Sequence, residues 1–331
     1  MNPYFLNRRA LLGAAASVVT LCVSATAQAQ VYPTKPIRMV VPFAAGGATD
    51  VLARILGEKM AVGLGQPIII DNKSGAAGII GTDVVAKAPA DGHTLVLSLS
   101  NSLLTNQFLY DKLPYSTQRD LTLVYQIAMA PVVLMVHPSV PARTGSELLK
   151  YMAANKGKLA YGSYGVGSYP HLAGAHMSLT QQADMNHIAY KGEAPMMQEL
   201  LGGQIQMAYA SALQAKPHIE SGRIRVIGVT GERRMATLPN VPTLVEQGLK
   251  DEAYRVTGWL AIAAPAGTPR AVVQRIADEV RKATQQPDVQ ARVAAMGFEI
   301  KDSSPEAFAA AYKLELPVWE RLIKQSGAKL E

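Results

Sequence analysis

The groups in this chain most able to bind a ligand are backbone N–H donors in glycine-rich loops. An apolar run at residues 37–41 is followed by a loop of small residues, 43–50, and then by an amphipathic helical pattern. The start of a helix carries four unpaired N–H groups and the positive end of the helix dipole, so a loop without bulk lets an anion reach them. The same pattern also occurs in an ordinary strand-to-helix turn. Repetition along the chain favours the anion site.

The same unit occurs twice more in the first third of the chain. An apolar run at 68–70 leads into a loop with glycines at 75, 78 and 81 and then into a helical pattern. A third strand, 94–97, runs into the hydroxyl and amide side chains of residues 98–102. Ligands of open α/β sheets bind at the carboxyl ends of strands, so three such loops predict one shared cleft. Serine and asparagine that only cap helices would give the same local pattern.

A second copy of this architecture follows residue 137. A strand at 159–162 leads into the Gly/Ser loop 163–168 and a helix at 170–180, with His171 at its start. A strand at 186–190 exits through Lys191 and Gly192, and further strands are expected at 205–209 and 225–230. The chain is therefore expected to form two α/β lobes whose loops face each other.

Two longer apolar strands, at 131–137 and 259–263, connect the predicted lobes. We expect an α/β fold of the two-lobed periplasmic binding protein type (type II-like), with two open doubly wound sheets joined by two crossover strands. The predicted division is a signal peptide at 1–29, a discontinuous lobe 1 at 30–131 and 257–331, and lobe 2 at 132–256. Lobes joined by two strands can rotate and close on a ligand between them.

The composition describes a soluble globular chain that is long enough for two cores. Of the 331 residues, 49% are apolar and 17% are charged. The net charge of +7 and the pI near 9.3 could suggest nucleic acid or a membrane surface as a partner. The basic residues are scattered, however, and aromatic residues are too sparse for a base-stacking platform. We expect no nucleic-acid partner and a monomer.

The first 29 residues are predicted to be a cleaved targeting segment. Arg8 and Arg9 precede an apolar run, and Ala27 and Ala29 supply the small residues of a signal-peptidase site. The paired arginines resemble a twin-arginine signal, so the choice between the two export routes stays open. Cleavage removes Cys22, the chain's only cysteine, and no later apolar run approaches the roughly 18 residues of a membrane span. The expected location is the periplasm.

The sequence contains two partial enzyme motifs, and each lacks a required glycine. A nucleophile elbow around Ser163 would need glycine at Tyr161, and a dinucleotide fingerprint beginning at Gly165 lacks its third glycine. His171 and His176 are five residues apart, which is not the metal-binding i, i+4 spacing. We therefore expect no catalytic residue, no metal and no cofactor, with a hydrolase as the weaker alternative. A DNA-sensing regulator would need a helix-turn-helix, and the pattern contains none.

Nine short motifs, in this order, resemble the Bug family, the extracytoplasmic solute receptors of the tripartite tricarboxylate transporter system. They lie at residues 42–50, 72–81, 91–95, 161–163, 171–174, 190–192, 200–204, 238–243 and 264–269. The resemblance covers the whole mature chain. It implies a receptor that binds a small carboxylate between two lobes and delivers it to a membrane permease. A ligand-sensing receptor for a signalling system is the alternative that it leaves open.

The candidate ligand-binding residues follow from the loops together with this resemblance. In lobe 1 they are Phe43, Ala44, Ala45, Gly46, Gly47, Thr49, Asp50, Ser74, Gly75, Ala76, Ala77, Ser98 and Asn101. In lobe 2 they are Ser163, Gly167, Ser168, His171, Tyr190, Lys191, Gly192, Ala210 and Ser211. Asp50 is itself acidic, so we expect it to orient the loop or a water and not to contact the anion.

The residue types near the second lobe's loops bear on the ligand class. Ala210 stands where many relatives have Asp, so a carboxylate partner for a ligand ammonium is missing there, although Glu193 in the neighbouring loop could substitute. Tyr164, Tyr169 and Tyr190 offer apolar faces with hydroxyl tips, although each could equally be a core residue. The pattern favours a dicarboxylate or an aromatic carboxylate without an amino group.

The targeting segment gives the first testable prediction. Intact-mass analysis of protein recovered from the periplasm should give a chain that starts at Gln30 or within two residues of it. Recovery of the uncleaved chain from the cytoplasm would contradict the prediction.

Overall fold

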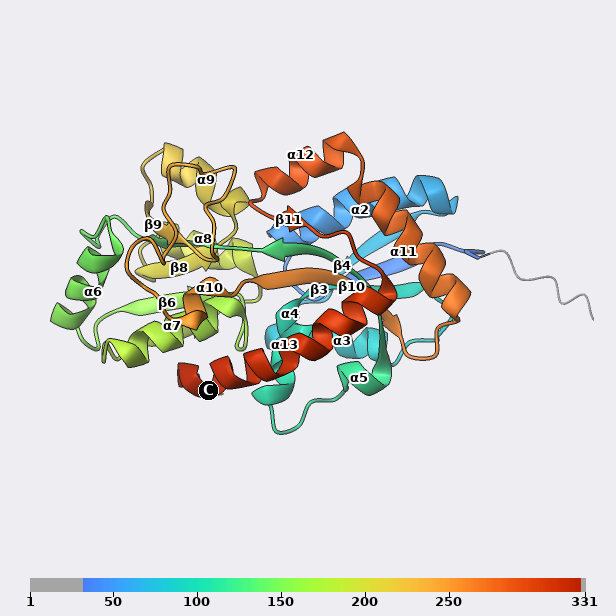
Figure 1. The fold of residues 1–331 in the computed structure, drawn as a ribbon, viewed down its shortest axis with the longest axis horizontal. Coiled ribbons are helices and arrows are strands. Elements are labelled where there is room, and N and C mark those ends of the chain that lie inside the picture. Colours follow the sequence, from blue (N-terminus) through green and yellow to red (C-terminus); the bar gives the residue numbers. More distant parts are fainter. Residues whose placement is uncertain (1–31, 329–331) are drawn as a thin grey trace, which may run out of the picture.

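The computed structural model describes residues 32–328, so the targeting segment and its cleavage site lie outside the described residues. The chain forms two sheets side by side, each flanked by helices (Figure 1). The α/β fold class predicted from the sequence is confirmed. Within the described residues, no helix is long and apolar enough to cross a membrane.

The first sheet has six strands in the order β11-β4-β10-β3-β1-β2. Its strands are β1 (Ile37–Val41), β2 (Ile68–Asn72), β3 (Thr94–Leu99), β4 (Leu121–Ala130), β10 (Gly258–Pro265) and β11 (Glu299–Ile300). The helical segments attached to it are α2 (Ala48–Leu64), η1 (Ala76–Gly78), α3 (Ile79–Ala86), α4 (Ser100–Leu103), η2 (Thr105–Phe108), α5 (Thr117–Asp120), α11 (Arg270–Thr284), α12 (Pro287–Ala295) and α13 (Pro305–Ser326).

The second sheet has five strands in the order β7-β6-β8-β5-β9. Its strands are β5 (Val133–Val136), β6 (Ala160–Ser163), β7 (Asn186–Ala189), β8 (Met207–Ala210) and β9 (Arg225–Val229). Its helices are α6 (Gly145–Ala154), α7 (Tyr169–Thr180), α8 (Glu193–Leu201), α9 (Ala212–Glu220) and α10 (Glu252–Arg255).

Strand register brings the glycine-rich loops to one edge. Strand β1 runs parallel to β2 and β3, so the loops that follow these strands all leave from the same edge of the first sheet. Strand β6 is likewise parallel to β7 and β8, which aligns the exits of lobe 2. The shared edge that the sequence predicted is therefore present in both sheets.

The connection between the sheets differs from the sequence prediction in one respect. The outbound strand expected at 131–137 is present as β5, which lies wholly in the second sheet, and an unpredicted strand, β4, precedes it and ends at Ala130 in the first sheet. The ten-residue strand β4 was missed because Thr122 and Gln126 interrupt its apolar run, although Gln126 is buried. Strand β4 pairs along its length with β10, which the sequence did predict.

Residue 98 also lies in a different element from the one expected. Strand β3 continues to Leu99, so Ser98 is a strand residue that is fully buried. Its hydroxyl lies 2.6 Å from the hydroxyl of Ser102. Ser98 therefore helps to fix the start of α4.

The C-terminal helix α13 spans both lobes. It packs against β4 of the first sheet and α7 of the second lobe (Figure 1). Its Trp319 belongs to one continuous core cluster with Trp259 of β10 and Leu172 of α7. Burial of these side chains couples the two lobes, since apolar surface removed from water contributes to stability wherever it lies.

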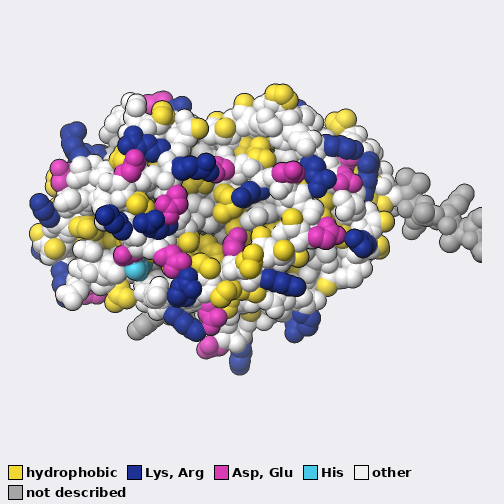
Figure 2. Space-filling model, in the orientation of Figure 1, with side chains coloured by type: hydrophobic (Ala, Val, Ile, Leu, Met, Phe, Trp, Pro, Cys, Tyr) yellow, Lys and Arg dark blue, Asp and Glu magenta, His cyan; other side chains and the backbone are white. Residues whose placement is uncertain are grey.

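Charged side chains are interspersed on the surface. On the face shown in Figure 2, Lys and Arg alternate with Asp and Glu without a single-sign patch. This distribution agrees with the sequence argument that basic residues are scattered.

Glu315 of α13 is a half-buried polar group beside this core. One carboxylate oxygen accepts the indole N–H groups of Trp259, at 2.6 Å, and Trp319, at 3.2 Å. Burial raises the pKa of Glu315 above its usual range, although the two indoles act in the opposite direction. The carboxyl thus binds its proton more tightly in the folded protein than in the unfolded chain.

Replacing Glu315 should separate its hydrogen bonds from its charge. Glu315→Ala leaves two buried indole N–H groups without an acceptor and should lower the free energy of unfolding by about 1–3 kcal/mol. Glu315→Gln should lose less, because both indoles use one oxygen that the amide keeps. Because the folded-state pKa of Glu315 is raised, its contribution to the free energy of unfolding decreases as the pH rises through that pKa. The Gln variant has no carboxyl group to titrate and should not show this decrease. Denaturant titration followed by tryptophan fluorescence at several pH values measures both effects.

Glu320→Ala on the same helix is the matched control, since Glu320 makes a surface pair with Lys324. Surface pairs contribute about 0–1 kcal/mol. Equal stability of the Glu315→Ala and wild-type proteins would contradict the assignment.

Candidate functional site

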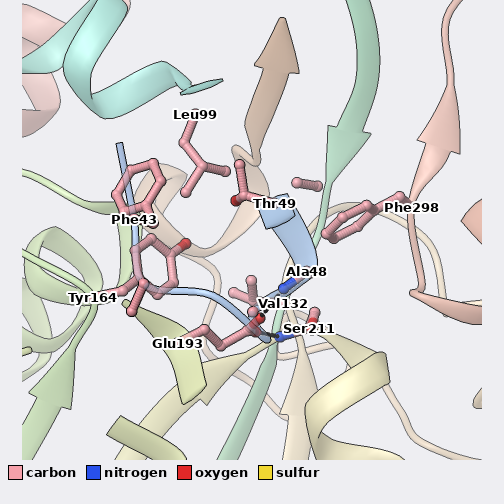
Figure 3. Close-up of a pocket in the computed structure, with 12 residues that line it drawn as sticks. Phe43, Ala48, Thr49, Leu99, Val132, Tyr164, Glu193, Ser211 and Phe298 are labelled. Atoms are coloured by element: carbon pink, nitrogen blue, oxygen red, sulfur yellow. Dashed lines mark hydrogen bonds between the residues drawn. The ribbon is translucent and has the colours of Figure 1, made fainter. Parts of the chain in front are cut away.

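A small cavity lies where the loops of the two lobes meet. It leaves about 30 Å³ for the centres of water-sized molecules, enough for about two waters. Its walls are mostly apolar and come from both lobes (Figure 3). The lining residues are Phe43, Ala44, Gly47, Ala48, Thr49, Leu99, Ala130, Val132, Tyr164, Glu193, Ser211 and Phe298.

A second cavity of about 160 Å³ shares two of these walls. The rings of Phe43 and Tyr164 line both cavities and meet edge to face, with centroids 6.5 Å apart. The remaining lining residues are Pro42, Gly75, Ala76, Ala77, Gly78, Tyr110, Gly165, Val166, Ala189, Tyr190 and Lys191. The ring pair therefore divides one interlobe space into two compartments.

Asp50 fixes the loop that follows β1. Its carboxylate accepts the backbone N–H of Gly46 at 3.0 Å, the side-chain amide of Asn72 at 3.0 Å and the guanidinium of Arg54 at 2.9 Å. Burial opposes ionisation, but these hydrogen bonds outweigh it and lower the pKa of Asp50. Asp50 is directed at its own loop and lines neither cavity.

The turn at residues 75–78 has an unusual backbone conformation. Ala76, Ala77 and Gly78 have φ angles of 44°, 53° and 86°, in the left-handed region. The carbonyl of Ala77 accepts the side-chain amides of Asn101, at 2.9 Å, and Asn106, at 3.2 Å, which holds this conformation. Successive N–H groups of such a turn can form an anion-binding concavity. Among the described residues, the N–H groups of Ala76 and Ala77 donate to no protein acceptor.

Helix α2 begins at the first cavity, where its N-terminus meets Glu193. The N–H of Ala48 donates to one oxygen of the Glu193 carboxylate at 3.0 Å, and the N–H of Ser211 donates to the other (Figure 3). Glu193 is only 8% exposed. Burial raises the pKa of Glu193, while the N–H donors and the Ser211 hydroxyl favour the charged form. This carboxylate uses backbone donors from both lobes.

Ten of the candidate residues from the sequence line the two cavities. They are Phe43, Ala44, Gly47, Thr49 and Ser211 in the first cavity, and Gly75, Ala76, Ala77, Tyr190 and Lys191 in the second, which also includes Phe43. The other candidates line neither cavity: Ala45, Gly46, Asp50, Ser74, Ser98, Asn101, Ser163, Gly167, Ser168, His171, Gly192 and Ala210. Several of these hold the loops in place, as Asp50 and Asn101 do.

His171 does not face either cavity, contrary to the sequence expectation. It is 3% exposed, and its Nδ1 accepts the N–H of Gly167 at 3.0 Å. Its ring packs against the ring of His187, with the ring centroids 4.2 Å apart. Burial, together with the neighbouring His187, lowers the pKa of His171 to about 3, and burial lowers the pKa of His187 to about 4. Both rings are neutral at pH 7, so neither supplies a positive charge for an anion.

Ser163 and Tyr169 also have structural roles. The Ser163 hydroxyl lies 2.8 Å from Nε2 of His187 and bonds within its own loop. Tyr169 lies in the core and donates its hydroxyl to the carbonyl of Ala253 at 2.7 Å. Tyr164 and Tyr190, by contrast, lie in the cavity walls.

Sequence reasoning missed most of the apolar walls. Leu99, Ala130, Val132 and Phe298 come from strand ends and from the C-terminal third of the chain, and no local motif marks them. Glu193 was considered only as a partner for an ammonium group. Within residues 32–328, no cluster of three or more His, Asp, Glu or Cys side chains is placed to hold a metal ion.

Two α/β lobes with facing loops around an enclosed space define the class of two-lobed solute-binding proteins. Comparison with solved structures supports this assignment. The structure of R. palustris Rpa4515 with adipate superposes with a TM-score of 0.86 at 32% identity, covering 90% of this chain and 100% of Rpa4515. The structure of MatC from Rhodopseudomonas palustris with bound malate superposes with a TM-score of 0.83 at 30% identity, covering 88% of this chain and 100% of MatC.

The family follows from the sequence comparisons. The model of the tripartite tricarboxylate transporter family receptor matches residues 52–328. Protein BugT of Bordetella pertussis is 33% identical over 315 residues, covering 95% of this chain and 96% of BugT. The chain therefore belongs to the tripartite tricarboxylate transporter receptor family of periplasmic solute-binding proteins, and the resemblance noted in the sequence is confirmed.

The Asp50 network predicts a specific dependence of stability on pH. Asp50→Asn keeps the shape but replaces an ionised acceptor, so it should cost about 1–3 kcal/mol of unfolding free energy at pH 7. The folded-state pKa of Asp50 is lowered, so its contribution is present above the unfolded pKa and is lost as pH falls through the folded value. The difference between variant and wild type should therefore shrink in acid.

Chemical denaturation from pH 7 to pH 3 measures this convergence. Asp111→Asn in an exposed loop is the control and should follow the wild type at every pH. A stability gap that stays constant with pH would show that the Asp50 charge is not the cause.

Proposed function

We propose that this receptor captures a small carboxylate between its lobes, with a dicarboxylate or an aromatic carboxylate without an amino group favoured. The observation that carries this proposal is the left-handed turn at 75–78, whose two unused N–H groups adjoin the second cavity. A carboxylate is the group that such donors bind best, because hydrogen bonds to a charged acceptor are stronger than those to a neutral one. The similar structures Rpa4515 and MatC contain adipate and malate, both of which are carboxylates, and this supports the same ligand class here.

The body of the ligand is expected to be apolar. Phe43, Tyr164 and Leu99 supply ring and aliphatic surface between the two compartments. Ligand sites of this kind combine apolar walls with a few directed polar groups. A ligand that reaches into both compartments requires the ring pair to shift, because the first cavity has room for only about two waters.

The lobe boundaries and partners belong to the same proposal. Lobe 1 comprises 30–131 and 257–331, lobe 2 comprises 132–256, and the hinge lies where β4 and β10 meet the second lobe. We infer that the chain is exported to the periplasm by its N-terminal signal and acts as a monomer that delivers its ligand to the family's membrane permease. The family consists of receptors, so we infer binding without catalysis.

Calorimetry and thermal-shift measurements with benzoate, adipate and aspartate test the ligand class. A bound ligand raises the melting temperature by mass action, so at least one of the first two acids should do so, and aspartate should not. Stabilisation by aspartate alone would contradict the proposal.

A pair of substitutions tests the position of the carboxylate. Asp and Asn both tolerate the left-handed conformation of the exposed Ala76. Ala76→Asp places a negative charge at the turn and should weaken binding of the acid by about tenfold or more beyond the effect of Ala76→Asn, which has the same shape without charge. Equal affinities of the two variants would exclude the turn as the anion site.

A further inference from the structure

One carboxylate of the protein itself already lies in the interlobe space. Glu193 is the first residue of α8, and its carboxylate lies at the N-termini of both α2 and α9. Helices α2 and α9 therefore direct the positive ends of their dipoles toward this group. Each helix is at least nine residues long.

The Glu193 carboxylate is hydrogen-bonded in the way that a bound anion would be, although burial outweighs these bonds and raises its pKa. The groups that favour its ionised form are the backbone N–H groups of Ser211 and Ala48 and the hydroxyl of Ser211. These donors come from opposite lobes. A carboxylate held by N–H groups from both sides of a cleft is the arrangement expected for a captured ligand.

Neighbouring bonds show that this contact is part of the junction between the lobes. The N–H of Ala44 donates to the carbonyl of Lys191 at 2.9 Å, and the side-chain amide of Gln214 donates to the carbonyl of Gly46 at 2.8 Å. Both bonds are made by the loop after β1, just before Ala48. The packing is close, since a Cβ added at Gly47 would lie 3.4 Å from the Cβ of Glu193.

We propose that the Glu193 carboxylate takes the place of a second ligand carboxylate between the lobes. Its hydrogen bonds to both lobes hold the lobes together, a contact that we call the latch, and its charge restricts the receptor to ligands with a single carboxylate. This inference rests on the proposed function and narrows it. The ligand carboxylate binds at the turn 75–78, and the neutral apolar end of the ligand lies toward Glu193, between Phe43, Tyr164 and Phe298. An aromatic monocarboxylate fits this arrangement, and a dicarboxylate does not.

The physical reason is repulsion between like charges. A second ligand carboxylate beside Glu193 would bring two carboxylates together in a buried site, where the N–H groups of Ala48 and Ser211 already donate to Glu193. One of the two groups would have to take up a proton or leave. Removing Glu193 frees the N–H groups of Ala48 and Ser211 for a ligand.

The test compares Glu193→Gln and Glu193→Ala with the wild type and with Glu220→Gln, a charge-matched control in the same lobe, at the exposed end of α9. Calorimetry with benzoate and adipate should show that the wild type prefers benzoate. Both Glu193 variants should gain about tenfold or more in affinity for adipate relative to benzoate. The control should keep the wild-type preference.

Small-angle scattering without added carboxylate measures the latch independently of any ligand. The Glu193→Ala protein should have a larger radius of gyration than the wild type, while its circular dichroism shows an intact fold. An unchanged radius would overturn the latch. Loss of benzoate binding in both variants would overturn the selectivity, because Glu193 would then be a ligand contact.

The same experiments separate this inference from the proposed function. Failure of every carboxylate to bind the wild type or either variant would contradict the proposed function and, with it, the selectivity, while the scattering result would still decide the latch. Tight binding of adipate to the wild type, unchanged in the variants, would contradict the selectivity alone.

Discussion

Unpaired backbone N–H groups at the junction of the lobes are the constraint on which this structure depends. Helices α2, α8 and α9 all begin there, and each brings donors that need an acceptor once water is excluded. The chain supplies two carboxylates for this purpose. Asp50 accepts the N–H of Gly46 within the first lobe, and Glu193 accepts N–H groups from both lobes. The position at which a ligand anion can bind depends on the backbone N–H groups that these two side chains do not use.

Further N–H donors lie at the turn 75–78, where three consecutive residues are left-handed and the N–H groups of Ala76 and Ala77 donate to no described acceptor. Two asparagines from α4 and η2 hold this turn through the carbonyl of Ala77. Gly165 of the opposite lobe approaches so closely that a Cβ there would lie 2.9 Å from the Cα of Ala77. The N–H groups available to an anion are thus positioned by side chains that do not touch it, and the second lobe closes directly over them.

The link between the lobes has two components. The chain crosses between the sheets in short segments after β4 and before β10, whereas α13 spans both lobes and shares a core with α7 and β10. Glu315 lies beside that core and accepts both indole N–H groups. Relatives that share this fold hold adipate and malate, both dicarboxylates. The fold of these two relatives therefore accommodates two ligand carboxylates, whereas in this chain a buried carboxylate of the protein itself, Glu193, lies between the lobes.

The sequence by itself determined the repeated strand–glycine–helix units, the two-lobed α/β class and the family, because these depend on local periodicity and on motifs of a few adjacent residues. It also indicated that the loops after β1 and β2 face a cleft. Only the tertiary structure decided which residues form that cleft. His171 stands at a helix start, as the pattern indicated, yet its ring is buried against His187. Phe298 reaches the cavity from the far end of the chain, and Glu193 meets Ala48 across a separation of 145 residues. Contacts between residues so distant in sequence leave no local pattern, because they arise only when the two sheets are brought face to face.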